Sequence, residues 1–302
     1  MPRSFTKISD LSEEEIQFVF RSCSEIKSGK TEPRPLKEKS VACIFTKQSL
    51  RTRVSFEVAI SELGGSPIYI TGDEIKLGVR ESIADAARVL SRYVALIMIR
   101  TFKQSDVEEL AEYAAVPVVN GLTDLVHPCQ ILGDYFTATE RLPNLKVYKV
   151  AYVGDGNNIA NSWLNLAARI PLDLRIGTAA STPPDEQILN RAKANPESRI
   201  LITDDPKEAV AEADVVYTDV WASMGQKDQA DKKSRLLEKF QVNASLLAGA
   251  SPDCLVMHCL PAERGKEITD EVMDGPNSVV FDQAENRLHI QKAIMAFLLR
   301  QP

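Results

Sequence analysis

The chain has 302 residues, of which 44% are hydrophobic and 26% are charged, and its formal net charge is -6. This composition is typical of a globular protein, and the length predicts two domains of ordinary size. The negative charge argues against the basic surfaces that bind nucleic acids or membranes. No apolar run approaches the ~20 residues that a membrane-spanning helix needs.

The cysteines and the first residues of the chain indicate where the protein works. The five cysteines are odd in number and scattered, which favours reduced thiols over a disulfide framework. The first residues lack the apolar core of a signal peptide, and the segment from Ser12 to Glu15 is already acidic. We therefore expect a cytoplasmic protein.

Taken in chain order, the first half of the sequence alternates between helical and strand patterns. A polar loop over 71–80 interrupts the alternation, because this segment has two glycines and no periodicity. The expected elements are a helix over 13–28, a strand over 41–45, a helix that follows Ser49 and ends at Gly64-Gly65, a strand over 68–70, a helix over 82–92, strands over 94–99 and 116–119, and a helix that begins at His127-Pro128.

Pro143 marks the expected domain boundary, and the alternation restarts after it. The expected strands cover 149–153, 172–176, 199–203, 215–218, 254–257 and 278–281, and the expected helices begin near Asn158 or cover 185–194, 206–212 and 284–299. Strand–helix alternation in both halves predicts parallel sheets with helices on both faces. The predicted fold class is therefore α/β, with two doubly wound parallel-sheet domains.

The segment 49–53, with the sequence SLRTR, lies where the strand over 41–45 gives way to a helix. Free backbone N–H groups and the positive end of the helix dipole favour an anion at such a place. Arginine adds a planar, permanently charged group that matches phosphate oxygens. The segment therefore indicates a phosphate-binding site, and the alternative is a solvated helix start with Ser49 as an ordinary N-cap.

The segment 154–158, with the sequence GDGNN, follows a strand and starts a helix, as a dinucleotide-binding fingerprint does. The third glycine of that fingerprint is missing, and so is the acidic residue expected after the next strand. Two asparagine side chains offer both donors and acceptors, which suits an amino-acid ligand better than a pyrophosphate. The alternative is a polar helix cap with tight glycine packing.

Two further strand ends carry polar side chains. Asp219 follows the strand over 215–218 and is placed to hold a ligand ammonium group, although a lone aspartate here is more often a loop or cap residue. Cys259 follows the strand over 254–257 and is either a packed small side chain or a polar contact. Its neighbour His258 would point to the opposite face of a continued strand, so we expect no metal site.

With these segments in order, the chain resembles the aspartate/ornithine carbamoyltransferase family over essentially its whole length. The SxRTR pattern at 49–53 and the HPxQ pattern at 127–130 mark the family. The Ser-Met-Gly element at 223–225 and the His-Cys-Leu-Pro element at 258–261 resemble its ornithine branch. The resemblance also includes Arg100, residues 154–158, Asp219 and Glu285-Asn286-Arg287.

The resemblance implies a reaction and an architecture. The reaction transfers the carbamoyl group of carbamoyl phosphate to the δ-amine of L-ornithine, giving L-citrulline and phosphate without a cofactor. The domain over 1–142 would bind carbamoyl phosphate, with the C-terminal helix over 284–302 packing back on it, and the domain over 143–283 would bind ornithine. Family members are homotrimers or higher multiples of trimers with sites at subunit interfaces.

The resemblance also implies which residues form the site. Carbamoyl phosphate would be bound by Ser49, Leu50, Arg51, Thr52, Lys76, Arg100, His127, Gln130, Cys259, Leu260 and Arg287. Ornithine would be bound by Asn158, Asp219, Ser223 and Met224. The catalytic residues would be Arg100, His127 and Cys259, and Cys259 is not expected to be a nucleophile because the reaction needs no covalent intermediate.

Two residues depart from the family pattern. Leu50 stands where threonine is usual, which removes one hydroxyl group but leaves the backbone N–H. Lys76 stands where many ornithine enzymes have glutamine, in a loop that reaches a neighbouring subunit's site in the family. The alternatives to the ornithine reaction are a sister carbamoyltransferase acting on putrescine, N-acetylornithine or another amine, a nicotinamide-dependent dehydrogenase, and a catalytically silent paralogue.

Overall fold

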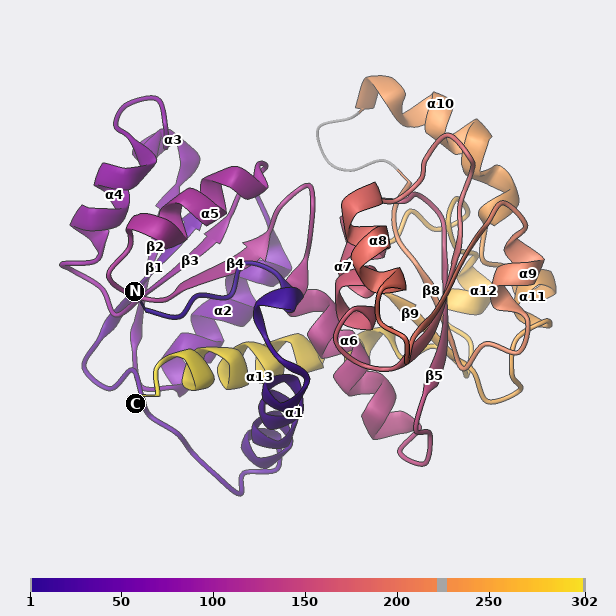
Figure 1. Cartoon of the computed structure of the whole chain (residues 1–302), viewed down its shortest axis with the longest axis horizontal. Helices are drawn as coiled ribbons and strands as arrows, with labels where there is room; N and C mark the ends of the chain where they lie inside the picture. Colours follow the sequence, from indigo (N-terminus) through magenta and orange to yellow (C-terminus); the bar gives the residue numbers. More distant parts are fainter. Residues whose placement is uncertain (1, 222–226, 301–302) are drawn as a thin grey trace. The chain divides into compact units, whose positions relative to one another are not determined.

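The computed structural model describes residues 2–221 and 227–300 and divides into two compact units (Figure 1). Unit 1 comprises Met1–Gly133 and Asn286–Pro302, and unit 2 comprises Asp134–Glu285. Each unit is built on one parallel sheet with helices on both sides, which confirms the predicted α/β fold class. Helices α6 (Pro128–Arg141) and α13 (Val280–Leu298) contribute residues to both units.

The sheet of unit 1 has four parallel strands in the order β2-β1-β3-β4. They are β1 (Ser40–Phe45), β2 (Ser66–Thr71), β3 (Leu96–Arg100) and β4 (Val118–Leu122). Strands β3 and β4 are buried throughout, as expected for parallel strands that helices cover on both faces. The strand order reverses between β1 and β3, and ligands bind parallel sheets at the carboxyl ends of strands at such a switch point.

Capping residues mark the N-termini of helices in unit 1. Ser12 and Ser49 each accept a hydrogen bond from a backbone N–H of the first helical turn, and Ser12 forms a capping box with Glu15. The helices of unit 1 besides α6 and α13 are η1 (Ile8–Asp10), α1 (Glu13–Lys27), α2 (Leu50–Glu62), α3 (Gly72–Ile75), α4 (Ile83–Leu90) and α5 (Gln104–Tyr113). Helices α4 and α5 pack on the sheet through a buried cluster that includes Ala87 and Leu110.

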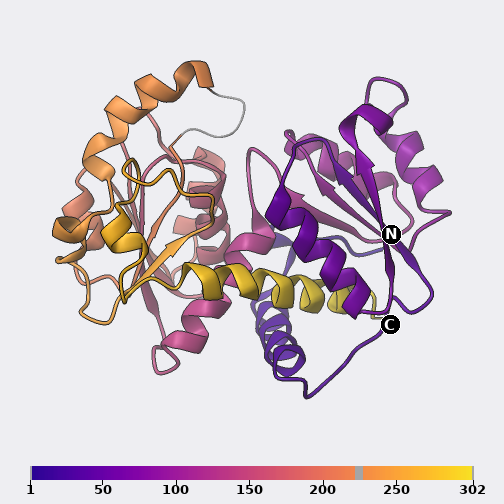
Figure 2. The ribbon, with the colours of Figure 1, turned by 180° about the vertical axis from the view of Figure 1, so that it is seen from behind.

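The last helix packs within unit 1, as predicted. The Lys27 side chain in α1 donates a hydrogen bond to Asn286 Oδ1 at 2.8 Å. The buried Lys292 side chain pairs with Glu62 of α2. Figures 1 and 2 show α1 beside the C-terminal part of α13 from both sides of the molecule. Arg287, near the start of this part of α13, is thereby brought to the residues that follow β1.

The sheet of unit 2 has five parallel strands in the order β7-β6-β5-β8-β9. They are β5 (Tyr148–Val153), β6 (Leu172–Gly177), β7 (Arg199–Thr203), β8 (Val215–Thr218) and β9 (Leu255–His258). The order reverses between β5 and β8. The switch point of this sheet therefore lies where the GDGNN segment leaves β5 and where Asp219 leaves β8.

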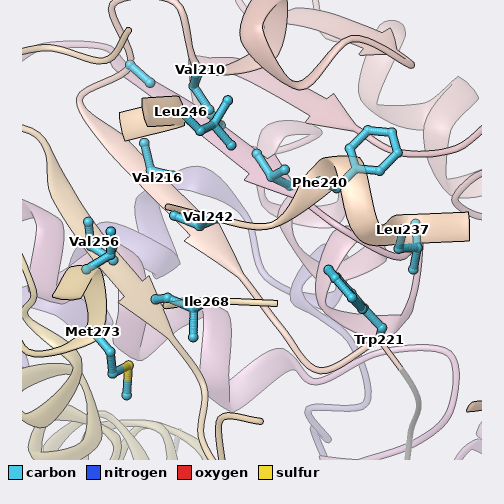
Figure 3. Close-up of a cluster of buried hydrophobic side chains, with 14 of the residues drawn as sticks. Val210, Val216, Trp221, Leu237, Phe240, Val242, Leu246, Val256, Ile268 and Met273 are labelled. Carbon is cyan, nitrogen blue, oxygen red and sulfur yellow. The ribbon is translucent and has the colours of Figure 1, made fainter. Parts of the chain in front are cut away.

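Short helices surround this sheet and share one apolar core. They are α7 (Asn158–Ala167), α8 (Glu186–Lys193), α9 (Pro206–Val210), α10 (Lys227–Leu237), η2 (Glu238–Phe240), α11 (Ala244–Leu247) and α12 (Asp270–Met273). Figure 3 shows the part of the core in which Trp221 and Leu237 lie near each other and Val216 and Val256 come from β8 and β9. This packing fixes the position at which the chain leaves β8 beyond Asp219.

Two expectations about elements were wrong. The predicted strand over 278–281 is absent, because Ser278 makes only an isolated bridge to Val256 and helix α13 begins at Val280. A short apolar run does not distinguish a buried strand from the start of a buried helix. The predicted loop over 71–80 contains helix α3, which Thr71 and Glu74 begin with a capping box. Among the residues that the structure describes, no helix has the length and hydropathy needed to cross a membrane.

Candidate functional site

Ser49 begins helix α2 at the carboxyl end of β1. Its Oγ accepts a hydrogen bond from the backbone N–H of Thr52 at 3.2 Å. The first turn of α2 therefore presents backbone N–H groups and the positive end of the helix dipole at the switch point of unit 1. Arg53 does not join them, because it pairs with Glu57 at 2.9 Å and its guanidinium lies 3.7 Å from the centre of the Tyr69 ring.

Two buried arginines meet at one buried hydroxyl group in unit 1. Arg100 ends β3, and its Nη1 donates to Thr52 Oγ1 at 3.0 Å. Arg287 comes from α13, and its Nη2 donates to the same oxygen at 2.8 Å. All three residues are at most 6% exposed. We call Thr52, Arg100 and Arg287 the arginine cluster, and its concentrated positive charge beside a helix N-terminus suits a dianionic phosphate group.

His127 lies close to the arginine cluster at the start of α6. Burial first, and then the charges of Arg287, Arg100 and Lys47, hold the pKa of His127 well below its usual range. The imidazole is therefore neutral at physiological pH and is able to donate a hydrogen bond without carrying charge. Gln130 lies one turn further along α6 and is also buried.

Lys47 is a cation that the sequence analysis did not identify. It is 8% exposed, its Nζ pairs with Asp124 at 2.8 Å, and it lies 5.3 Å from the centre of the Phe102 ring. Its position two residues before Ser49 was the available clue, but burial of a lysine is not visible in a sequence. Lys47 adds to the positive potential around His127.

The other residues expected in unit 1 lie at its surface. Leu50 is 74% exposed at the first position of α2. Arg51 follows it, half-buried. Lys76 has a left-handed backbone conformation, with φ of 41°, at the C-terminal end of α3. Its side chain is exposed and makes no hydrogen bond or ion pair with the part of the chain that the structure describes.

In unit 2, Asn157 and not Asn158 caps helix α7. Asn157 Oδ1 accepts a hydrogen bond from the backbone N–H of Ile159 at 2.8 Å, and its Nδ2 donates to Asp219 Oδ2 at 2.8 Å. Asn158, the predicted residue, is the first residue of the helix and is half-buried. The sequence analysis noted both asparagines but did not distinguish the cap from the residue after it.

Asp219 and Cys259 are in direct contact. Cys259 Sγ donates to Asp219 Oδ1 at 2.9 Å. We call Asn157, Asp219 and Cys259 the Asp219 cluster, and it offers a carboxylate for an ammonium group at the carboxyl ends of β5, β8 and β9. Ser223 and Met224, which the sequence analysis added to this group, lie outside the described residues.

His258 supports the loop that carries Cys259 and Leu260. Its Nδ1 accepts a hydrogen bond from the backbone N–H of Leu260 at 2.9 Å, and its Nε2 lies 3.2 Å from Oε1 of the buried Glu267. These contacts assign the proton to Nε2. Strand β9 ends at His258, so the alternation of side chains along a strand does not extend to Cys259. The argument that led us to expect no metal site therefore does not apply here. One polar atom each of Asp219, His258 and Cys259 lie within 4.8 Å of one another.

Gly156 permits a close approach of two backbone segments. A Cβ atom at this position would lie 2.3 Å from Thr182 O and 2.5 Å from the carbonyl carbon of Pro183. The backbone N–H of Gly156 donates to Thr182 O at 3.1 Å. The segment after β6 therefore occupies the space that a dinucleotide pyrophosphate would need beside the second glycine of its fingerprint. This packing argues against the dehydrogenase alternative.

Comparisons with known proteins agree over the full length of the chain. A family model described as the carbamoyl-P binding domain of aspartate/ornithine carbamoyltransferase matches residues 3–140. A second, described as the Asp/Orn binding domain of the same proteins, matches residues 146–298. The ornithine carbamoyltransferase of Syntrophus aciditrophicus is 48% identical over 302 residues, which cover 99% of this chain and 100% of the relative. The anabolic enzyme of Pyrococcus furiosus is 46% identical, with 98% of this chain and 96% of the relative covered.

Solved structures give the same result. Ornithine carbamoyltransferase from Pyrococcus furiosus superposes with a TM-score of 0.93 at 46% identity, covering 98% of this chain and 96% of the other. The anabolic ornithine carbamoyltransferase from Campylobacter jejuni superposes with a TM-score of 0.93 at 36% identity, covering 98% of each chain.

Proposed function

Because the chain belongs to the aspartate/ornithine carbamoyltransferase family, we propose that it transfers the carbamoyl group of carbamoyl phosphate to the δ-amine of L-ornithine, giving L-citrulline and phosphate. The observation that carries the proposal is the convergence of Arg100 and Arg287 on Thr52 beside a helix N-terminus. We assign carbamoyl phosphate to residues 1–142 with 284–302, and ornithine to residues 143–283. The two matching family models support this assignment.

The phosphate group of carbamoyl phosphate is the leaving group, and its negative charge grows as the bond to carbon breaks. Ser49, Arg51 and Thr52, with the backbone N–H groups of α2 from Leu50 onward, hold this group. Arg100 and Arg287 stabilise the charge on the phosphate and on the carbamoyl oxygen. Preorganised donors of this kind need no reorganisation at the moment of reaction, which is why they lower the barrier.

His127 donates a hydrogen bond to the carbamoyl oxygen, and Gln130 supports the same group. A neutral imidazole suits this role, because it stabilises the developing oxyanion without adding a buried charge. The pKa of His127, which burial and the neighbouring cations hold low, keeps the imidazole in that form. Cys259 and Leu260 contact the carbamoyl group from the loop that follows β9.

Ornithine is held by its α-amino and α-carboxylate groups, and its δ-amine attacks. Asp219 pairs with the α-ammonium group, and Asn158 with Ser223 and Met224 binds the rest of the amino-acid end. The attacking amine must be neutral, although its pKa in water is about 10. The departing phosphate is a suitable base for the proton that the amine loses on attack. Cys259 stays a thiol that donates to Asp219 and positions the substrate.

The proposal extends to assembly and location. We propose a homotrimer or a higher multiple of trimers, in which Lys76 reaches the carbamoyl phosphate of a neighbouring copy. An exposed apolar row on α2 supports a second copy as partner, since Leu50, Val54 and Val58 recur every four residues and are 74%, 48% and 39% exposed. We propose a cytoplasmic protein, which its five free cysteines support.

Ornithine is favoured over N-acetylornithine by Asp219, and over putrescine by the groups proposed to bind the α-carboxylate, Asn158 and Ser223. Putrescine has no α-carboxylate, and N-acetylornithine has no charged α-amino group to pair with Asp219. A site built to pair a substrate charge strongly rejects an analogue that lacks it, because its own polar groups stay unpaired. We therefore expect kcat/KM for ornithine to exceed the values for both analogues by at least about 100-fold.

The test is a carbamoylation assay with the purified protein. Carbamoyl phosphate is supplied with ornithine, putrescine, N-acetylornithine or aspartate, and the carbamoylated product is quantified. Asp219→Asn is assayed beside the wild type and should raise KM for ornithine while leaving KM for carbamoyl phosphate unchanged. Preference for another amine would contradict the assignment of ornithine, and turnover with none of the four would favour a silent paralogue.

A further inference from the structure

Asp155 and Lys233 form a largely buried ion pair in unit 2 that the proposed mechanism does not use. Asp155 lies in the loop between β5 and α7, and Lys233 lies in α10. Lys233 Nζ is 2.6 Å from Asp155 Oδ2, and the two side chains are 21% and 11% exposed. Burial raises the pKa of the Asp155 carboxyl, and the ammonium group of Lys233 opposes that effect.

A second carboxylate, Asp219, lies at the same edge of the sheet. Asn157 connects the two, because its backbone N–H donates to Asp155 O at 2.7 Å and its side chain donates to Asp219 at 2.8 Å. Burial, and then Asp219, Asp155 and Cys259, raise the pKa of the Tyr152 phenol. Both carboxylates are therefore near the same buried ring and near each other.

The two carboxylates differ in their partners. Asp155 has the ammonium group of Lys233, whereas Asp219 accepts hydrogen bonds from Asn157 and Cys259 and has no ion-pair partner among the side chains described in 2–221 and 231–300. Among the described side chains, the titratable and charged groups near the two carboxylates are Tyr152 from β5, Tyr217 from β8 with its partner Asp134, Lys233 from α10, Cys259 after β9, and the His258–Glu267 pair behind Cys259.

Of the two carboxylates Asp155 and Asp219, Asp155 is the one that pairs with the ammonium group of Lys233. Ornithine in water carries two ammonium groups, but only the form with a neutral δ-amine is able to attack carbamoyl phosphate. We infer that Lys233, by neutralising Asp155, leaves Asp219 as the single carboxylate available to the substrate and so favours bound ornithine with one ammonium group. The inference rests on the proposed ornithine reaction and makes Lys233 a positioning residue that acts through charge.

Loss of the Lys233 charge should hold a proton on the attacking amine. With Asp155 and Asp219 both uncompensated, the site would stabilise ornithine with two ammonium groups. An additional negative charge nearby in a partly buried site shifts a titration by about one pH unit or more. The rising limb of kcat against pH reports groups in the enzyme–substrate complex, so it should move to higher pH by about one unit.

The experiment compares four variants with the wild type. Lys233→Met removes the charge and keeps the apolar stem, and Lys233→Arg keeps the charge. Lys232→Met is the matched control, because Lys232 is the exposed neighbour on the same helix. In the double variant Asp155→Asn/Lys233→Met both charges of the pair are removed. The total charge of the site is then that of the wild type, although the ion pair is lost. For each, kcat is measured with both substrates saturating between about pH 6 and pH 10.

We expect the rising limb to shift in Lys233→Met only, and to return toward the wild-type position in Lys233→Arg and in the double variant. A purely structural role predicts a different result, namely a loss of kcat that is equal at every pH and is not rescued in the double variant. That result, or a wild-type profile in Lys233→Met, would overturn the inference. Failure of the ornithine reaction itself is recognised separately, because the wild type would then produce no citrulline at any pH.

Discussion

At the scale of single residues, His127 links burial to chemistry. Its imidazole is buried beside three cations, and each of these features disfavours the imidazolium form. The same neighbours that we propose to stabilise the negative charge of the phosphate therefore also keep His127 neutral. A neutral donor next to these cations is suited to a carbonyl oxygen, whereas an imidazolium would add a fourth buried positive charge.

Replacing His127 tests this role. We expect His127→Gln to lower kcat by about 100-fold, because a donor to the developing oxyanion is displaced. The acid limb of the pH profile should keep its position, since His127 is neutral throughout the working range. The measurement is kcat from about pH 6 to pH 9 for both proteins. Disappearance of a limb near the usual histidine pKa of about 6.5 in the variant would show that His127 titrates, contrary to this account.

The low pKa of His127 has a matching effect on stability. Below the pKa of the unfolded chain, about 6.5, the unfolded state binds a proton that the folded state does not. This difference has no effect on the free energy of unfolding above that pH. As the pH falls below it, the free energy of unfolding decreases. His127→Gln should weaken this acid dependence of the free energy of unfolding, which urea titrations at neutral and mildly acidic pH would measure.

Residues at strand ends were accessible from the sequence, and residues defined by packing were not. Ser49, Arg100 and Asp219 were accessible because each lies at or shortly after the carboxyl end of an apolar strand, where parallel sheets bind ligands. Arg287 was included only through the family resemblance, since it lies 235 positions from Thr52 in the chain. Lys47 was missed, and Asn157 was noted without its role as the cap, because neither burial of a lysine nor the direction of a cap is encoded in local spacing.

At the scale of elements, apolar runs followed by caps were sufficient to place most strands and helices. They failed at Ser278–Phe281, where an apolar run begins helix α13 and does not continue the sheet. The pairing with Val256 there is limited to one isolated bridge at Ser278, formed through Asn277 and Val279, and helix α13 begins directly after it. A sequence window that ends at residue 281 contains no information about that partner.

The GDGNN segment provides a test at this scale. We expect Gly156→Ala to destabilise unit 2 by about 2 kcal/mol, because the new Cβ would overlap the backbone of Thr182 and Pro183. The displaced loop carries Asn157, so KM for ornithine should rise while KM for carbamoyl phosphate is unchanged. Gly249→Ala is the control, since a Cβ there meets its nearest atom at 3.5 Å. Urea unfolding and steady-state kinetics of both variants are the measurements, and equal behaviour of the two would refute the steric account.

At the scale of the whole molecule, each unit repeats one plan. A parallel sheet reverses its strand order, and the side chains that carry chemistry leave the carboxyl ends of strands at or beside that reversal. In unit 1 these side chains are cationic, and in unit 2 they include carboxylates. The charges match the two proposed substrates, because carbamoyl phosphate is an anion and the amino-acid substrate presents ammonium groups.

The exposed apolar row on α2 is the surface that we propose to contact a second copy of the chain. Leu50, one of the two residues that depart from the family pattern, belongs to the same row as Val54 and Val58 and begins the helix whose N-terminus we propose to bind the phosphate. Isolated exposed apolar residues are normal on a protein surface, but a row along one helix face supports the proposed contact with a second copy. A threonine at position 50 would place a hydroxyl group at the end of this row.

Charges introduced into the row should separate the subunits. We expect Val54→Asp/Val58→Asp to reduce the mass in solution from about three times 33.4 kDa to that of one chain, because burying two carboxylates without partners is costly. The exposed Val147→Asp, on unit 2, is the matched control and should leave the mass unchanged. Light scattering with size-exclusion chromatography measures the mass, and an unchanged mass in the double variant would place the contact elsewhere. If Lys76 binds the carbamoyl phosphate of a neighbouring copy, the separated chains should also show a raised KM for carbamoyl phosphate. Lys76→Gln in the assembled protein should raise the same KM.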